Sequence, residues 1–186
     1  ATNPTILSGE IGDTNSLLDN SRHVVRAASL TTAGVTLDGF TIHGGCADDP
    51  ADGGVGGGVY STATRPFSIQ NCTFLFNSST NFGGGIFSDA TSRLLIVNCT
   101  FISNQSGYRG GGLYIGGAQQ GIHLLSNCFF AGNTCTNLNS NGGGAYLLNV
   151  TTMLVANCTF SNNFLPSNGS GGGAGLAISA PPIISN

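Results

Sequence analysis

A seven-residue phrase built on Asn-Cys-x-Phe occurs four times in this chain and constrains its fold more than any other feature. The copies are NCTFLFN at 71–77, NCTFISN at 98–104, NCFFAGN at 127–133 and NCTFSNN at 157–163. A second phrase, three glycines followed by an aliphatic and usually an aromatic residue, alternates with it at 56–60, 83–87, 110–114, 142–146 and, in degenerate form, 171–175. The cysteines of the first phrase lie 27, 29 and 30 residues apart. Such a tandem repeat cannot bury a core within one unit, so neighbouring units must stack.

Each unit consists of three short strand-like stretches separated by glycine or asparagine. The stretch that precedes the first asparagine is apolar, as in FSIQN, LLIVN and MLVAN. The 30 glycines oppose helices, since each costs about 1 kcal/mol in a helix interior. Three short strands per unit with variable loops are typical of a parallel β-helix, whose coils stack about 4.8 Å apart. We therefore predict an all-β fold, a three-sided β-solenoid of about five to six coils with incomplete terminal coils.

Stacked coils place equivalent residues in columns along the axis. The first asparagine of the phrase is expected at a bend, because asparagine tolerates the left-handed backbone conformation. The cysteine and the phenylalanine should then point inward, and the second asparagine should mark the exit bend. The predicted columns are Asn71, Asn98, Asn127 and Asn157; Cys72, Cys99, Cys128 and Cys158; Phe74, Phe101, Phe130 and Phe160; and Asn77, Asn104, Asn133 and Asn163.

The repeat predicts one domain, residues 1–186, with three zones. Residues 1–54 form degenerate coils, in which Gly39 takes the bend position; residues 55–170 form regular coils; and residues 171–186 form an incomplete last coil. Residues 4–9 match a third strand without the two before it, whereas 181–186 match a second strand. Placed end to end, two copies would complete one coil, so we expect a head-to-tail interface that propagates into a filament. Its contact residues would be Thr5, Ile6, Leu7, Ile183 and Ile184.

The alternation of GGG-aliphatic-aromatic with CTF-x-x-N resembles the repeats of chlamydial polymorphic outer-membrane proteins and related secreted bacterial β-helix proteins. Residues 3–45 are similar to the opening of pectin-lyase-like domains in large bacterial surface proteins. This resemblance implies a right-handed parallel β-helix exported to the bacterial surface or the medium, often adhesive or structural. Compared with that family, we expect this sequence to lack the earlier coils and a C-terminal anchor.

The amino-acid composition limits the classes of partner and the cellular location that we expect for this protein. Charged residues make up 7% of the chain, lysine is absent and the net charge is −3, so no basic face suggests nucleic acid. The apolar runs are too short for membrane insertion, which takes about 20 residues per helix. A surface poor in charge and rich in Ser, Thr, Asn and Gly suits an extracellular or cell-surface protein.

The cysteines and the possible metal ligands have structural interpretations. Stacked inward cysteines are spaced too widely for an easy disulfide, so a column of buried thiols is favoured over one or two bridges or a metal site. Cys46 and Cys135 fall in predicted loops and are the better candidates if any bridge exists. Asp48, Asp49 and Asp52 form a weak calcium candidate whose alternative is a solvated turn. The three histidines, His23, His43 and His123, share no metal-like spacing and are expected at the surface or at strand ends.

No cofactor motif and no convincing catalytic group emerge. A carbohydrate-cleaving β-helix needs converging carboxylates, and most of the eight acidic residues fall in turns. An aromatic column is expected on the outside, where it either binds sugars or screens the backbone; its members are Tyr60, Phe87, Tyr114 and Tyr146. N-glycosylation is possible at the sequons of the exit bends and loops, namely Asn77, Asn104, Asn149 and Asn168.

These observations lead to one principal hypothesis and two alternatives. The principal hypothesis is a non-enzymatic extracellular structural protein whose partner is itself, polymerised head to tail into a β-solenoid fibre. The first alternative is a fragment of a larger bacterial surface adhesin or a carbohydrate-binding β-helix, whose partners would be glycans or a host or cell surface. The second is a polysaccharide lyase or hydrolase.

Overall fold

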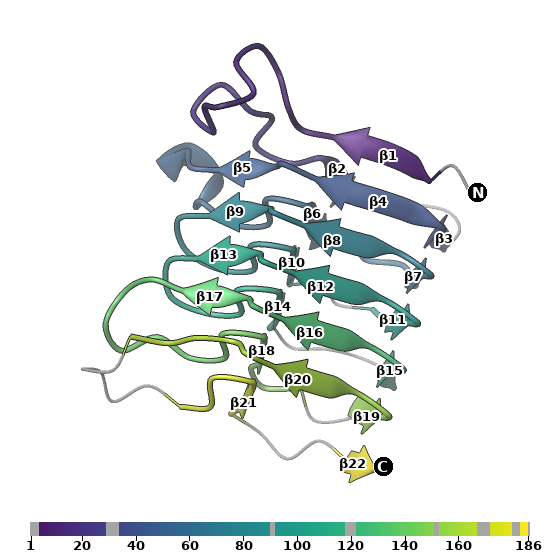
Figure 1. Cartoon of the computed structure of the whole chain (residues 1–186). Coiled ribbons are helices and arrows are strands. Elements are labelled where there is room, and N and C mark those ends of the chain that lie inside the picture. The colour runs from purple at the N-terminus through teal and green to yellow at the C-terminus, as the bar shows by residue number, and fades with distance from the viewer. Residues whose placement is uncertain are drawn as a thin grey trace.

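The computed structural model describes residues 4–28, 34–89, 92–117, 122–150, 153–166, 172–179 and 183–185. Apart from one short 3-10 helix, η1 (Pro50–Asp52), every regular element in these ranges is a β-strand. The strands stack in parallel as successive turns of a single coil (Figure 1). Within the same ranges, no helix has the length and apolar character needed to cross a membrane.

Three six-stranded sheets and one four-stranded sheet form the faces of the coil. Sheet A contains β1 (Thr5–Ser8), β4 (Phe40–His43), β8 (Thr73–Leu75), β12 (Thr100–Ile102), β16 (Phe129–Ala131) and β20 (Thr159–Ser161). Sheet B contains β2 (Val25–Ala28), β6 (Val59–Thr62), β10 (Ile86–Ser88), β14 (Leu113–Ile115), β18 (Ala145–Leu147) and β21 (Leu176–Ile178). Sheet C contains β3 (Val35–Asp38), β7 (Phe67–Gln70), β11 (Leu94–Val97), β15 (His123–Ser126), β19 (Met153–Ala156) and β22 (Ile183–Ser185). Sheet D contains β5 (Cys46–Ala47), β9 (Ser78–Ser79), β13 (Gln105–Ser106) and β17 (Thr134–Cys135).

This topology confirms the predicted parallel β-helix. Each regular coil passes through sheets B, C, A and D in turn, and equivalent residues pair one to one, as Phe74 does with Phe101 and Phe101 with Phe130. Sheet D was not predicted. Its strands have only two residues each and are mostly polar, so they lack the apolar alternation that marks a strand in a sequence.

The first asparagine of each phrase occupies the bend that was predicted for it. Asn71, Asn98, Asn127 and Asn157 have φ angles between 52° and 54°, and Gly39 takes the same role in the first coil with φ 77°. Their exposed amides also join successive coils, since Asn98 Nδ2 donates to Asn71 Oδ1 and Asn127 Nδ2 to Asn98 Oδ1, both at 3.2 Å. The sequence therefore located this corner correctly.

The second bend lies one residue earlier than predicted. The left-handed residues there are Phe76, Ser103, Gly132 and Asn162, with φ between 52° and 63°. The asparagine that follows each of them is not the bend residue, because its side chain turns into the interior. Asn77, Asn104 and Asn133 have no exposed surface.

These inward asparagines form a fully hydrogen-bonded ladder. Asn104 Nδ2 donates to Phe74 O at 3.0 Å and to Asn133 Oδ1 at 2.9 Å. Asn104 Oδ1 in turn accepts from both the backbone N–H and the side-chain amide of Asn77. Asn133 repeats the arrangement with Phe101 O and Asn163. A buried carboxamide is tolerated because each of its donors and acceptors has a partner.

The phenylalanine column packs beside this ladder, inside sheet A. The rings of Phe74, Phe101, Phe130 and Phe160 are nearly parallel, with centroids 4.8, 4.4 and 4.7 Å apart along the column. Phe74, Phe101 and Phe130 are completely buried. The ring spacing follows the strand spacing, so one residue type fills the same place in every coil.

The triple glycines are required by close backbone approach. In the copy at 83–85, Gly83 has φ 63°, and a Cβ on Gly84 would lie 2.1 Å from the carbonyl oxygen of Gln105. Side chains are therefore excluded where the chain turns into sheet B next to the following coil.

His123 lies at a strand end, one of the two places predicted for it, but it is not a surface residue. It opens strand β15, but its side chain has no exposed surface and points into the core. Its Nδ1 accepts a hydrogen bond from the backbone N–H of Leu94 at 3.0 Å, whereas its Nε2 has no hydrogen-bond partner. Burial, followed by the charge of Arg93, holds the pKa of His123 below its ordinary value of 6.5.

The two ends of the stack carry different strands. β1 lies at one end of sheet A, while β21 and β22 lie at the opposite end of sheets B and C. Residues 9–24 form a flap that rises beside β5 at the first end (Figure 1). The flap is tied to the coil by backbone hydrogen bonds from Cys46 to Ser21 and from Gly9 to His43.

Truncation of Phe101 to alanine removes a ring from the middle of the phenylalanine column. We expect the free energy of unfolding to fall by about 3–5 kcal/mol, because the neighbouring rings are fixed by their own coils and cannot close the cavity. Phe129→Ala is the control, since Phe129 is 41% exposed on the other face of sheet A. Equal losses in chemical denaturation would contradict the assigned column.

Substitution of Asn104 by alanine breaks the interior ladder. It removes the acceptor of the Asn77 backbone N–H and of one Asn77 amide hydrogen, and Phe74 O and Asn133 Oδ1 each lose one donor, so we expect a loss of about 3 kcal/mol or more. Asn98→Gly serves as the comparison, because glycine keeps the left-handed bend and only exposed hydrogen bonds are lost. Thermal unfolding of both variants tests whether the buried asparagine contributes more to stability than the exposed one. A larger loss in Asn98→Gly would contradict this prediction.

The buried His123 predicts acid sensitivity. Its folded-state pKa is lowered, so the unfolded chain binds the proton more readily and stability is lost as the pH falls below the ordinary value of 6.5. Denaturation measured across this range should show that His123→Leu flattens the pH dependence. Met153→Leu, a change at the equivalent core position of the next coil, removes no titratable group and should leave it in place. An unchanged slope in His123→Leu would contradict this assignment.

Candidate functional site

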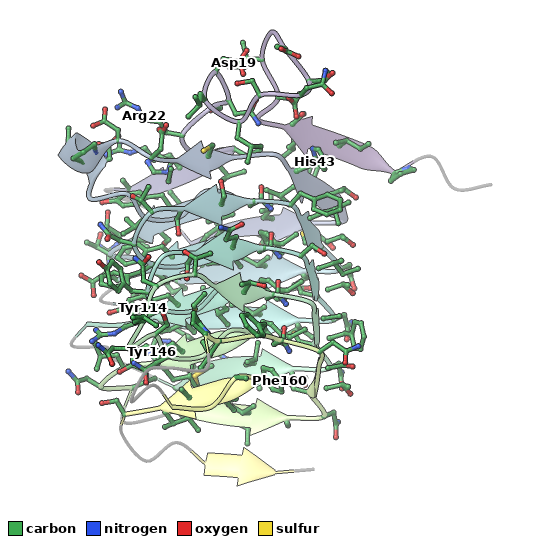
Figure 2. The ribbon with its side chains drawn as sticks, turned by 60° about the vertical axis from the view of Figure 1, so that its left-hand side comes forward. Asp19, Arg22, His43, Tyr114, Tyr146 and Phe160 are labelled. Carbon is green, nitrogen blue, oxygen red and sulfur yellow. The ribbon has the colours of Figure 1, made fainter. Side chains whose placement is uncertain are left out.

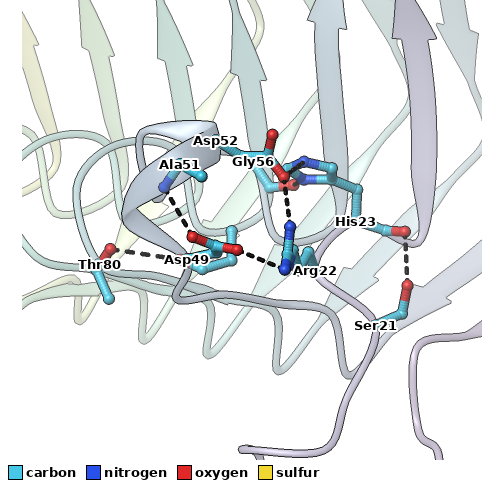
Figure 3. Close-up of polar contacts among 9 residues, drawn as sticks. Ser21, Arg22, His23, Asp49, Ala51, Asp52, Gly56 and Thr80 are labelled. Atoms are coloured by element: carbon cyan, nitrogen blue, oxygen red, sulfur yellow. Dashed lines mark hydrogen bonds and ion pairs between the residues drawn. The ribbon is translucent and has the colours of Figure 1, made fainter.

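The calcium candidate at 48–52 is engaged by an arginine instead. Arg22 forms ion pairs with Asp49 and with Asp52, the latter at 3.1 Å (Figure 3). Asp49 also accepts from the N–H of Ala51 and caps η1. The hydrogen bond that Arg22 donates to Asp52 and the charge of Asp49 raise the pKa of Arg22. A calcium ion would have to displace this guanidinium, and no group of three or more His, Cys, Asp or Glu suited to a metal occurs in the part of the chain that the structure describes.

The repeated cysteines form a column of free thiols beside the bend asparagines. Each Sγ donates to the backbone carbonyl two residues earlier, as Cys99 does to Val97 O at 3.3 Å, and contacts a carbonyl of the preceding coil, Ile69 O at 3.6 Å. Cys72, Cys99 and Cys128 are buried in the core cluster. They act as small core residues with weak hydrogen bonds to the backbone.

Cys46 and Cys135 were predicted to lie in loops, but they lie in the first and last strands of sheet D. Both are buried free thiols. Three strand spacings of about 4.8 Å separate their strands, too far for a disulfide between them. Burial raises the pKa of Cys135, opposed by a hydrogen bond from Ser106. Sequence reasoning missed this position because sheet D itself was missed.

The aromatic column lies on the outer face of sheet B, as predicted. Val59, Ile86, Leu113 and Ala145 point into the core, while the aromatic residues form a separate cluster. Rings of Tyr60, Phe87, Tyr114 and Tyr146 follow one another with centroids 5.8, 5.2 and 5.8 Å apart. Tyr114 and Tyr146 lie on this flank (Figure 2) and are 6% and 8% exposed. Such burial favours the backbone-screening interpretation over an open sugar-binding surface.

Arg109 contributes to this screening. Its guanidinium lies 5.5 Å from the ring centre of Phe82 and 5.3 Å from that of Tyr146. Asn81, Phe82, Tyr108, Arg109 and Asn139 line a small cavity of about 250 Å³ beside the aromatic cluster. Burial raises the pKa of Tyr114. The guanidinium of Arg109 therefore packs against the rings of the aromatic column.

A concave feature lies on the flank formed by sheet D and the flap. Two adjoining cavities of about 390 and 330 Å³ share Leu17, Ser78 and Gln105, and together we call them the sheet D groove. The larger cavity is also lined by Cys46, Ala47, Asp48, Ser79, Thr80, Gly107, Thr136 and Asn137. The smaller is also lined by Glu10, Thr14, His43, Phe76, Asn77 and Ser103. The groove runs along the axis, because its lining residues come from successive coils.

Sequence reasoning missed this groove, although one signal was present. Phe76 occupies the bend position that Ser103, Gly132 and Asn162 fill in the following coils, so a bulky residue interrupts an otherwise small or polar column. The groove holds one carboxylate in each cavity, Glu10 and Asp48. The candidate residues from the repeat do not line it, except for Asn77.

The glycosylation candidates divide by burial. The prediction of glycosylation was wrong for Asn77 and Asn104. Their side chains are completely buried in the interior ladder, so no glycan can be attached to them in the folded coil. Asn149 is exposed at a bend with φ 55°, and it stays a prediction. Asn168 lies outside the described residues.

Comparison with known proteins agrees with this architecture. The sequence profile of the family described as "Right handed beta helix region" matches residues 57–186, more than half of the chain. No curated protein and no solved structure matches the chain. The matched segment contains all four Asn-Cys-x-Phe phrases, which build the stacked columns described above. The chain therefore belongs to the right-handed β-helix family.

Proposed function

We propose that this protein is a non-enzymatic structural β-solenoid of an extracellular assembly, extended along its axis by head-to-tail association of copies. The observation that carries the proposal is the match between the strands at its two ends. Sheets A, B and C present the edges of β1, β2 and β3 at one end, and of β20, β21 and β22 at the other. A second copy placed in register would pair β20 with β1, β21 with β2 and β22 with β3.

Backbone pairing of this kind repeats what every interior coil already does. β21 and β22 provide the sheet B and sheet C strands of a further coil, and β1 of the next copy would provide its sheet A strand. The predicted contact residues lie in these strands: Thr5, Ile6 and Leu7 in β1, and Ile183 and Ile184 in β22. Parallel strand edges with unpaired N–H and C=O groups are the usual site of strand addition.

Exposed apolar side chains at the ends of the core columns favour their burial against a second copy. Leu7 pairs with Ile42 in register and so begins the column that continues into Phe74, while the last ring, Phe160, is only partly buried at the far end. Val35 begins the matching column of sheet C and is 40% exposed. Axial contact would bury these column ends, and the partner would need to accommodate the flap beside β5.

The enzymatic alternative has weaker support. A polysaccharide lyase or hydrolase needs converging carboxylates or a metal-bound carboxylate. Asp49 and Asp52 are paired with Arg22, and Glu10 and Asp48 line different cavities of the sheet D groove. A fragment of a bacterial surface adhesin is the other alternative, in which the same edges are covered by further coils of one polypeptide.

Val35→Lys tests axial association. The substitution places an ammonium group at the open end of a core column, where a stacked copy would have to bury it, so the association constant should fall at least about tenfold. Ile122→Lys is the matched control, because Ile122 is 63% exposed on the flank. Sedimentation of both variants and the unmodified chain, with electron microscopy of the unmodified chain, gives the readout. A chain that stays monomeric at high concentration, or equal effects of the two variants, would reject the filament.

A further inference from the structure

Phe76 is an unusual residue for the place that it occupies. It adopts φ 53°, a conformation that costs a bulky L-residue roughly 1–2 kcal/mol, and its side chain is 53% exposed. The same corner is made by Ser103, Gly132 and Asn162 in the next three coils, so the fold itself does not require an aromatic ring there. Strained, exposed residues of this kind concentrate at binding sites.

Phe76 forms part of a small aromatic surface in the sheet D groove. Its ring meets that of His43 edge to face, with centroids 6.0 Å apart. Both residues line the smaller cavity, together with Leu17 of the flap, which is 50% exposed. An exposed ring and an aliphatic side chain in one cavity suit the C–H face of a sugar or a similar ring.

Glu10 contributes a carboxyl group to the cavity. Its Oε1 is buried without a hydrogen-bond partner, and no ion pair to Glu10 occurs among the described residues. Neither cavity of the groove is lined by an arginine, and the other cavity adds a second carboxylate, Asp48. The groove therefore attracts a cation and repels an anionic chain.

Hydroxyl and amide groups complete the lining along the axis. Ser78 and Gln105 border both cavities, and Ser103 and Thr14 border the one that contains Glu10. Ser79, 7% exposed, lines the larger cavity with an Oγ that has no hydrogen-bond partner. Because the coils recur every ~4.8 Å, such groups repeat along the groove and match a ligand with regularly spaced hydroxyls.

We propose that the sheet D groove binds an oligomer of amino sugars, a chain of hydroxyl-bearing rings that carry primary ammonium groups. In this arrangement one ammonium group donates to the carboxylate of Glu10 and lies near the ring of Phe76, which attracts cations through its face. The neighbouring rings lie along Ser78 and Gln105 toward Asp48. This ligand site is independent of the proposed axial assembly, which uses the ends of the stack.

Calorimetric titration of the full chain with a glucosamine tetramer tests the proposal. We expect binding that weakens with added salt and that falls roughly tenfold in each of the variants Glu10→Gln and Phe76→Asn. Phe76→Asn is informative because asparagine occupies the equivalent corner at position 162, so this variant should fold at least as stably as the unmodified chain. Asp89→Asn and Tyr108→Ala, which change an exposed acid and an exposed aromatic residue outside the groove, should bind normally.

Titrations of the unmodified chain with an N-acetylated tetramer, with spermidine and with calcium ions distinguish the chemistry of the ligand. The fully N-acetylated tetramer lacks the ammonium groups and should bind at least about tenfold more weakly, as should spermidine, which lacks the hydroxyl-bearing rings. Equal affinity for either compound would overturn the proposal. So would an unmodified chain that does not bind the glucosamine tetramer, unchanged binding in Glu10→Gln and Phe76→Asn, or a site that takes calcium ions through Glu10 and excludes the tetramer.

Discussion

Parallel pairing of each coil with the next dictates which residues this chain can use. Pairing in register places every residue about 4.8 Å from its equivalent in the neighbouring coils, so each position must hold a side chain that packs well against copies of itself. Stacked phenylalanine rings meet this condition by parallel contact, and asparagine meets it by donating to one neighbour while accepting from the other. The repeated phrase NCxFxxN is the sequence form of this constraint.

The same constraint explains which structural features could be predicted from the sequence. The bend at Asn71, the inward Cys72 and the Phe74 column follow from residue types that have few other reasons to recur in register. The interior position of Asn104 could not be inferred, because asparagine is equally suited to a left-handed bend and to a hydrogen-bonded ladder. The choice depends on which backbone carbonyls lie opposite, and this is known only once the coil is built.

Features that occur in a single coil were the hardest to predict. His123 stands where Phe67, Leu94 and Met153 stand in other coils, so its burial is evident only from the register of sheet C. The clamp between Arg22 and the carboxylates of Asp49 and Asp52 joins segments that are distant in the sequence and has no repeat to reveal it. The sheet D groove likewise depends on the flap, whose Leu17 borders both cavities.

Function in such a fold is therefore more readily found where the repeat is broken than where it is kept. A column of identical residues is already explained by its own packing, whereas a residue that departs from its column has to be explained by something outside the coil. Phe76 departs from a bend column at an energetic cost, and the flap brings Glu10 close to it in one cavity. By contrast, the strand edges at the two ends of the stack retain the repeat and can form the same parallel strand pairing again. The ends thus suit assembly, and the flank suits a ligand.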